Sequence, residues 1–249
     1  MLKDFMLLRA MVKGAGGGGI TPTGDINITE NGEFDVTEFA KAIVNVASGG
    51  GDEASVVNSL IERRITEISS NVTMVGAYAF TSCSKLTTVN MPLATMVDIE
   101  AFYDCRALTT VNIPLVTTIY GNAFYNCYFL RTVDMSLVTT LGSGAFRNCQ
   151  RLKTANMPVV TSIDKNTFYG CSALTTVILQ NETLVTLSAV SAFTSTPIAN
   201  GTGWIYVPRA LVDSYKSATN WSNYATQFRA LEDYTVDGTI TGELDESKI

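Results

Sequence analysis

The sequence predicts an α/β repeat fold, a solenoid of about 22-residue coils whose strands form parallel β-sheets. The first observation is a phenylalanine that recurs every 22 residues. The second is a cysteine three residues after each phenylalanine, and the third is a leucine three residues after each cysteine. The copies are Phe80, Phe102, Phe124, Phe146 and Phe168; Cys83, Cys105, Cys127, Cys149 and Cys171; and Leu86, Leu108, Leu130, Leu152 and Leu174.

Each coil carries its own strand and turn signals. Apolar and polar residues alternate from Leu86 to Met91, which predicts a short strand with one buried face. Pro92 follows, and proline ends a strand because it supplies no amide donor. A second apolar position, Val97 in this coil, precedes a turn-rich or helical piece carrying Ala-Phe-x-x-Cys. A spacing of three keeps Phe, Cys and Leu inward over one tight turn, so all three columns are predicted core.

The repeat Leu-x-x-Val-x-Ile-Pro…Val-Thr-x-Ile-x-x-x-Ala-Phe-x-x-Cys resembles the BspA-like leucine-rich repeats of bacterial surface proteins. Residues 108–127 are close to a consensus copy, and the resemblance covers about residues 60–234. It implies a right-handed, curved leucine-rich-repeat solenoid, often found in bacterial cell-surface and prophage-associated proteins. It implies no particular ligand, because the family is defined by its scaffold.

Two glycine-rich linkers set the predicted domain boundaries. Residues 1–19 are expected to form an amphipathic helix and a flexible linker. Residues 20–51 are expected to form a small β-hairpin module and a second linker, with Asn31-Gly32 as its turn. Residues 52–234 are the predicted solenoid with helical caps, and residues 235–249 are an acidic tail. Residues 28–46 look like short segments of tail-associated phage proteins.

A solenoid has to cover its apolar core at both ends. At the first end, the pattern predicts a capping helix over residues 52–64 and an irregular half-coil over residues 65–74. At the other end, residues 204–208 read as the final strand, followed by capping helices over residues 209–219 and 221–231. The apolar residues predicted to form this lid are Leu211, Tyr215, Trp221, Tyr224 and Phe228.

Composition and charge exclude several classes of partner. The 249-residue chain has a net charge of −6 and no basic stripe, which argues against nucleic acid as a partner. No stretch approaches the length of apolar sequence that a membrane span needs. The apolar run at residues 1–12 is too short for a signal peptide, so we expect either a removed leader or release by another route, such as lysis.

The residues that catalysis would need are missing. The chain contains no histidine, which excludes His-based triads and weakens any metal site. Its five cysteines recur with the repeat, so we expect buried free thiols and neither zinc nor disulfides. Asp98 and Asp164 lie three coils apart, roughly 14 Å, too far for a carboxylate pair. We therefore expect no enzyme and no cofactor.

Polar rows along the outer surface are the candidate ligand-binding positions. One row stacks asparagine and aspartate side chains, and a neighbouring threonine row is interrupted by Arg131 and Lys153. Tyr128 and Phe129 replace small residues beside Arg131, and an exposed aromatic pair next to arginine is typical of a binding hot spot. The alternative is that these rows only solvate the sheet and bond along the stack. The amide row is Asn90, Asn112, Asp134 and Asn156. An invariant threonine row, for which that structural role is favoured more strongly, is Thr73, Thr95, Thr117, Thr139 and Thr161.

Two functional hypotheses follow. The first is a non-catalytic recognition protein, secreted or at a bacterial cell surface, that binds host protein or glycan through the solenoid. The second is a structural or receptor-binding component of a phage or prophage tail, with residues 1–48 forming the assembly end and a possible homo-oligomer. The absence of a secretion signal and the resemblance of residues 28–46 favour the second, whereas the repeats fit either.

Overall fold

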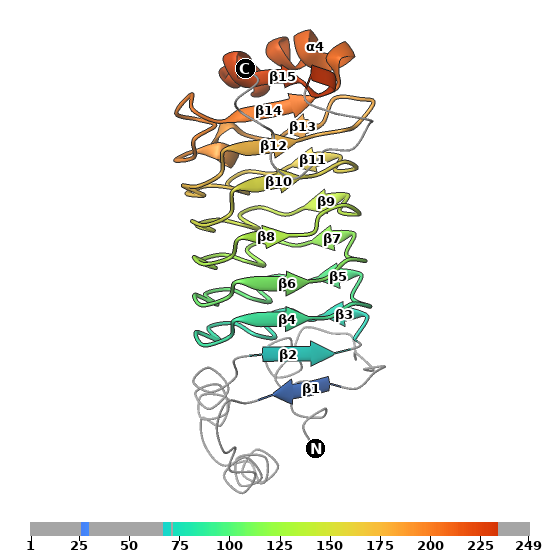
Figure 1. Ribbon diagram of the computed structural model, residues 1–249, viewed down its shortest axis with the longest axis vertical. Coiled ribbons are helices and arrows are strands. Elements are labelled where there is room, and N and C mark those ends of the chain that lie inside the picture. The colour runs from blue at the N-terminus through green and yellow to red at the C-terminus, as the bar shows by residue number, and fades with distance from the viewer. Residues whose placement is uncertain (1–25, 30–66, 71, 234–249) are drawn as a thin grey trace, which may run out of the picture.

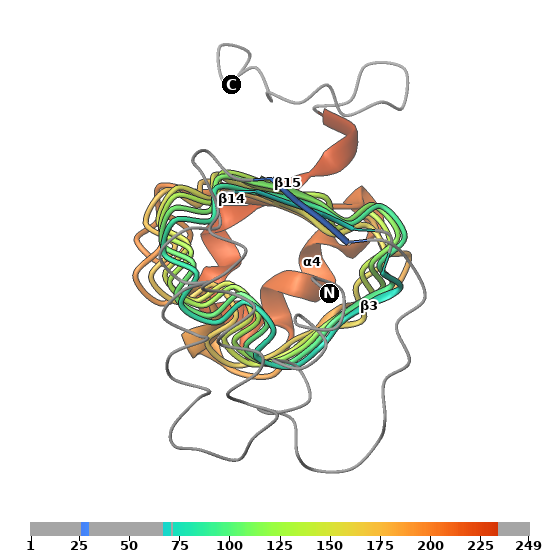
Figure 2. The ribbon, with the colours of Figure 1, turned by 90° about the horizontal axis from the view of Figure 1, so that it is seen from below.

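The computed structural model of the chain describes residues 26–29, 67–70 and 72–233, and these form an elongated stack of coils (Figure 1). Colour changes steadily along the long axis in Figure 1, and the coils superimpose when viewed down that axis in Figure 2. The amphipathic helix predicted within residues 1–19, the capping helix predicted over residues 52–64, the hairpin turn at Asn31-Gly32 and the tail over residues 235–249 lie outside the described residues.

Each coil from β2 to β13 contributes one strand to a first sheet and one to a second sheet. In the first sheet, equivalent positions of successive coils are paired in parallel, as Val89 is with Val111, which confirms the 22-residue period. The first sheet is built from β2 (Glu67–Ser70), β4 (Thr88–Asn90), β6 (Thr110–Asn112) and β8 (Thr132–Val133), continued by β10 (Thr154–Asn156), β12 (Thr176–Ile178), β14 (Trp204–Val207) and β15 (Phe228–Ala230). The second sheet is built from β3 (Met74–Val75), β5 (Met96–Val97), β7 (Thr118–Ile119), β9 (Thr140–Leu141), β11 (Ser162–Ile163) and β13 (Thr186–Leu187).

The first coil is more regular than the sequence suggests. Within the segment predicted to be an irregular half-coil, Glu67–Ser70 forms strand β2, which pairs in parallel with β4. On its other side β2 pairs antiparallel with β1 (Ile26–Thr29), which lies in the stretch predicted to form the small β-hairpin module. Glu67–Ser70 forms a strand because the open edge of β4 offers unpaired backbone N–H and C=O groups. Hydrogen bonds to these groups do not depend on the side-chain pattern of the pairing segment.

The first sheet is interrupted between β8 and β10, where no strand pairing joins the two halves. This is the coil in which Ser136 replaces the proline that ends other strands. The Ser136 amide donates to Asp134 Oδ1 at 2.9 Å, a local turn bond that proline cannot make. Strand β8 accordingly ends at Val133, one residue earlier than its neighbours β6 and β10.

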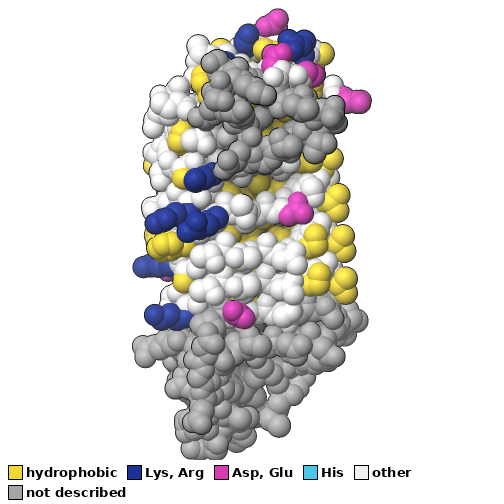
Figure 3. All heavy atoms as spheres, in the orientation of Figure 1, with side chains coloured by type: hydrophobic (Ala, Val, Ile, Leu, Met, Phe, Trp, Pro, Cys, Tyr) yellow, Lys and Arg dark blue, Asp and Glu magenta, His cyan; other side chains and the backbone are white. Residues whose placement is uncertain are grey.

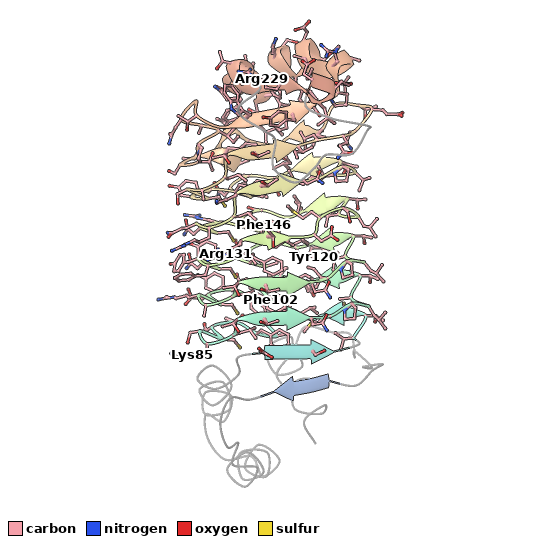
Figure 4. The ribbon with its side chains drawn as sticks, in the orientation of Figure 1. Lys85, Phe102, Tyr120, Arg131, Phe146 and Arg229 are labelled. Carbon is pink, nitrogen blue, oxygen red and sulfur yellow. The ribbon has the colours of Figure 1, made fainter. Side chains whose placement is uncertain are left out.

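The phenylalanine rings form one continuous stack, which confirms the predicted core. Adjacent rings from Phe80 to Phe193 lie 5.2–5.7 Å apart between centroids, with planes within 12° of parallel. Phe193 joins the stack although it follows Phe168 by 25 residues rather than 22. The repeated cysteine and leucine side chains are buried beside these rings. Figure 4 shows Phe102 and Phe146 within the body of the stack.

The Ala-Phe-x-x-Cys segment takes the turn alternative in the five copies from Phe80 to Cys171, whereas the equivalent segment that ends at Phe193 forms a short 3-10 helix. Two residues of each coil have left-handed backbone, with φ between 54° and 73°. Asparagine, aspartate and glycine tolerate this region better than other residues, which explains why they recur there. The two columns are Tyr78, Glu100, Asn122, Gly144 and Asn166, and Ser82, Asp104, Asn126, Asn148 and Gly170.

Aromatic side chains close the C-terminal end of the core, as predicted. The Trp221 indole donates to the Val185 carbonyl at 2.7 Å, and the Val185 amide donates to the Tyr215 hydroxyl at 3.0 Å. The Tyr224 hydroxyl donates to the Val190 carbonyl at 2.7 Å. The lid thus satisfies backbone groups that the last coil leaves open. Its short helices are η2 (Arg209–Leu211), α4 (Val212–Ser217), η3 (Trp221–Gln227) and η4 (Leu231–Asp233), after η1 (Val190–Phe193) in the last coil.

The predicted helix over residues 221–231 is wrong at its C-terminal end. Phe228–Ala230 is strand β15, which pairs in parallel with β14, so residues 204–208 do not supply the last strand of the sheet. The free edge of β14 accounts for this, because pairing with it outweighs the local preference of three residues.

Candidate functional site

The amide row bonds mainly along the stack. Asn112 Nδ2 donates to Asn90 Oδ1 at 2.6 Å, and Asn90 Nδ2 donates to Ser69 Oγ at 3.1 Å. Asn156 Oδ1 accepts from Gln180 Nε2 at 3.4 Å, whereas Asp134 turns back to its own loop. These contacts fit the alternative that the row stabilises the sheet, and a ligand-binding role for it stays a prediction.

The invariant threonine row bonds to the backbone of the adjacent coil. Thr95 Oγ1 donates to the Thr73 carbonyl at 3.1 Å, and Thr117 Oγ1 repeats this contact with Thr95 at 3.3 Å. Thr139 and Thr161 continue the series, each with a contact of 3.2 Å to the coil before it. This row therefore joins successive coils, which explains why threonine does not vary there.

Arginine side chains cover the two aromatic residues singled out from the sequence. The Arg106 guanidinium lies 5.9 Å from the centre of the Tyr128 ring, and that of Arg151 lies 5.1 Å from the centre of the Phe129 ring. Phe129 remains 46% exposed. Arg131, which the sequence places beside this pair, is exposed and directly precedes β8. The partners that sequence reasoning missed share a repeat position with the aromatic residue, 22 residues away in each case.

A second column of aromatic and cationic side chains runs through the same turns. The Tyr103 and Tyr125 rings stack at 4.8 Å, and the Arg147 guanidinium lies between the rings of Tyr125 and Tyr169, at 5.4 and 4.6 Å. Arg147 Nε is buried, and no hydrogen-bond partner for it is found among the described residues. Burial and the neighbouring phenol of Tyr125 raise the pKa of Tyr103, which therefore remains a neutral hydroxyl.

Six cations from these turns and the adjoining strand starts form what we call the basic edge: Lys85, Arg106, Arg131, Arg147, Arg151 and Lys153. Figure 3 shows Lys and Arg side chains gathered along one side of the stack, where Figure 4 labels Lys85 and Arg131. Arg106 pairs with Asp104 at 2.9 Å, but within the described ranges the other five make no ion pair. A chain of net charge −6 thus carries a locally positive surface.

An apolar row was not identified from the sequence. The residue after each strand-ending proline, or after Ser136, is a large aliphatic side chain that is 41–46% exposed. Figure 3 shows hydrophobic side chains on the side of the stack opposite the basic edge. The 22-residue spacing of these positions is the sequence signal that could have identified the row. The row is Leu93, Leu115, Leu137 and Val159.

The cysteine column has a structural role. All five thiols are free and buried, as predicted, and Cys105 Sγ donates to the Phe80 carbonyl of the preceding coil at 3.0 Å. Cys127, Cys149 and Cys171 repeat this bond to the phenylalanine 25 residues earlier. Burial raises the pKa of each of these four thiols, which disfavours the reactive thiolate.

The part of the chain that the structure describes contains neither a cluster of metal ligands nor a helix that could span a membrane. In that part, no three His, Cys, Asp or Glu side chains are grouped so that they could hold a metal ion. None of its helices has the length and hydrophobicity needed to cross a membrane.

A family model described as "BspA type Leucine rich repeat region (6 copies)" matches residues 59–175 and 95–202 of the chain, overlapping ranges that together cover more than half of it. No curated protein matches the sequence significantly.

Solved structures of three bacterial proteins are similar. A leucine rich cell surface protein of Faecalibacterium prausnitzii A2-165 has 25% identity and a TM-score of 0.45, over 64% of this chain and 43% of its own. The T. pallidum leucine rich repeat protein has 22% identity and a TM-score of 0.38, over 53% of this chain and 70% of its own. A leucine-rich repeat protein of Bacteroides ovatus ATCC 8483 has 19% identity and a TM-score of 0.43, over 64% and 45%. The chain spans less than half the length of the first and third proteins.

Proposed function

The chain belongs to the BspA-type leucine-rich repeat family, and from that premise we propose that it is a non-catalytic recognition protein that binds host protein or glycan at a bacterial surface. Repeat solenoids offer an extended surface in which equivalent positions of successive coils vary while the core stays constant. This chain follows that division, because its phenylalanine, cysteine and leucine columns are buried and nearly invariant. Among the departures from the repeat, Phe129 and Arg131 are exposed and Tyr128 is partly exposed.

The observation that carries the proposal is the aromatic–cation pairing on the basic edge. Tyr128 and Phe129 are each covered by an arginine from an adjacent coil, which restricts both partners before any ligand arrives. Preorganised aromatic and arginine side chains are the residues that most often dominate binding energy. Within this proposal, Arg131 and Lys153 extend the surface toward the first sheet, where the amide row lies beside them.

A non-catalytic role is supported by the chemistry of the described residues. All five cysteine thiols are buried. Burial raises the pKa of the four from Cys105 to Cys171, and the hydrogen bonds of these four go to the backbone of the solenoid. The chain contains no histidine that could act as a general base near neutral pH. The exposed groups on the basic edge are suited to contact and charge recognition rather than to proton transfer.

The proposal is tested by screening the full chain against a glycan array and a panel of host surface proteins. Tyr128→Ser and Phe129→Ala are suitable variants, because serine or alanine occupies the equivalent positions of other coils, as Ser84 and Ala107 do. Each should weaken binding by about tenfold if the pair is a hot spot. Leu115→Ala on the apolar row is the control and should leave affinity unchanged. Unchanged binding by both edge variants would refute the site, and a wild-type chain without any ligand would refute the function.

A second function, as a structural or receptor-binding part of a phage tail, is favoured by the resemblance of residues 28–46 to tail-associated segments. On this proposal residues 1–48 assemble copies of the chain into a fibre. Sizing of the full chain by light scattering should then give an oligomer, and antibodies against the chain should label tails of phage particles in electron micrographs. A monomer and unlabelled particles would rule out this second function.

A further inference from the structure

We propose that the basic edge binds a linear anionic polysaccharide, one that carries carboxylate or sulfate groups at regular intervals. This inference rests on the proposed recognition function and names the class of its ligand. The edge comprises Lys85, Arg106, Arg131, Arg147, Arg151 and Lys153, six of the ten Lys and Arg residues that the structure describes. The remaining four are Lys165, Arg209, Lys216 and Arg229.

The charge on the edge is largely available for an external anion. Asp104 neutralises Arg106, but in the described part of the chain no carboxylate pairs with Arg131, Arg151 or Lys153. All three side chains are exposed to solvent. Arg147 is held between tyrosine rings by contacts that leave its charge uncompensated, and its Nε has no described partner. An unpaired cation that is partly buried between aromatic rings attracts a nearby anion more strongly than a fully solvated cation does.

The arrangement of the charges favours a polymer over a folded acidic protein. Equivalent positions of neighbouring coils are separated by about 4.8 Å, the distance between paired strands. Arg131 and Lys153 share one repeat position and Phe129 and Arg151 share another, so each pair lies one coil apart along the axis. The six cations occupy four repeat positions, but all of them follow one side of the stack (Figure 3), which matches a polymer that carries its anions along its length. A folded acidic protein presents its carboxylates over a curved surface instead.

Hydroxyl groups beside the cations favour a sugar polymer over an acidic peptide. Tyr103, Tyr125, Tyr128 and Tyr169 lie in the same turns, and no hydrogen bond from their hydroxyls is found within residues 72–233. A phenol can both donate to and accept from a sugar hydroxyl. The edge therefore offers cations for the anionic groups and phenols for the hydroxyl groups between them, which matches the chemistry of an acidic polysaccharide.

The test compares a variant of the edge with a charge-matched control. Arg131→Thr/Lys153→Thr removes two cations and installs the residue present at this position in other coils, such as Thr109, so the fold is expected to persist. Lys165→Ser/Lys216→Gln lowers the net charge equally but lies outside the edge. Binding of the full-length chains to immobilised dextran sulfate, hyaluronate and neutral dextran is measured at several salt concentrations. Arg131→Lys/Lys153→Arg changes the same two positions but keeps their charge. Retained binding in this variant shows that the edge variant loses binding through lost charge and not through lost fold.

The expected result is binding to at least one anionic polysaccharide that weakens with salt, with about a tenfold loss in the edge variant and about the wild-type affinity in the control and charge-conserving variants. Equal loss in the edge and control variants overturns the inference, since net charge alone would then explain the binding. The inference is also overturned if the chain binds neutral dextran as strongly as the anionic polysaccharides. The same holds if poly-glutamate or single-stranded DNA competes for the chain as strongly as a soluble anionic polysaccharide does. If the edge variant still binds host surfaces like the wild type, the inference fails while the proposed function stands. If the wild type binds no host protein or glycan at all, the proposed function itself fails.

Discussion

Replacing Phe124 with alanine should lower the free energy of unfolding by about 3–5 kcal/mol, the range found for buried Phe→Ala changes. The Phe124 ring is fully buried in the middle of the stack. It lies 5.2 Å from Phe102 and 5.3 Å from Phe146, with interplanar angles of 10° and 1°. The substitution therefore opens a cavity that rigid coils on both sides cannot close.

Two terms contribute to this magnitude. Loss of the buried ring removes a transfer free energy of about 2–3 kcal/mol. Loss of two aromatic contacts adds about 0.5–1.5 kcal/mol for each. Because each coil of a solenoid contacts only its neighbours, the change weakens two coil interfaces and no others. The two terms together give about 3–6 kcal/mol, which overlaps the range of about 3–5 kcal/mol for buried phenylalanine.

The measurement is urea unfolding followed by circular dichroism, with the free energy taken by linear extrapolation. Phe129→Ala is the matched control, because Phe129 lies in the same coil but is 46% exposed and alanine occupies its position in the neighbouring coil as Ala107. The control should cost less than about 1.5 kcal/mol. If the two variants lose equal stability, or Phe124→Ala loses less than about 1 kcal/mol, the ring stack is not the main packing element.

Three further predictions concern the turns, the lid and pH. Asn126→Ala should cost about 1–2 kcal/mol in urea unfolding, because it strains a φ of 59° and removes the bond to Asp104, whereas Asn126→Gly should cost less; equal costs would contradict this reason. Trp221→Phe should lower the melting temperature measured by calorimetry, since it leaves the buried Val185 carbonyl unpaired at a cost of about 1–3 kcal/mol; an unchanged melting temperature would show that this bond is dispensable. Burial raises the pKa of Cys171 from 9.0 to about 12, so its contribution to stability is complete below pH 9 and is lost as the pH rises toward 12. The free energy of unfolding should therefore fall between pH 8 and pH 10 by about 1.4 kcal/mol for this thiol, and the urea midpoint with it; a constant midpoint would contradict the shift.

The basic edge illustrates what sequence reasoning found and what it missed. Tyr128, Phe129 and Arg131 stand out because they depart from the repeat, and that departure is visible in the sequence. These three residues were grouped because they are close in the sequence, and that criterion did not identify the arginines that cover the two rings. Those arginines come from adjacent coils, at the same repeat position as the ring that they cover. In a solenoid the nearest neighbour in space is often one period away, and the period was therefore the better guide.

By itself the sequence determined the coil length, the buried columns and the lid, because a constant period forces equivalent side chains into register and leaves no other way to bury them. The tertiary structure alone decided how each polar row is used. Whether a side chain donates to the preceding coil, as Thr95 does, or points to solvent without such a bond, as Arg131 does, depends on its direction and on backbone groups in another coil. It also decided that Phe228–Ala230 is a strand, because the edge that it pairs with is formed by residues more than 20 positions earlier.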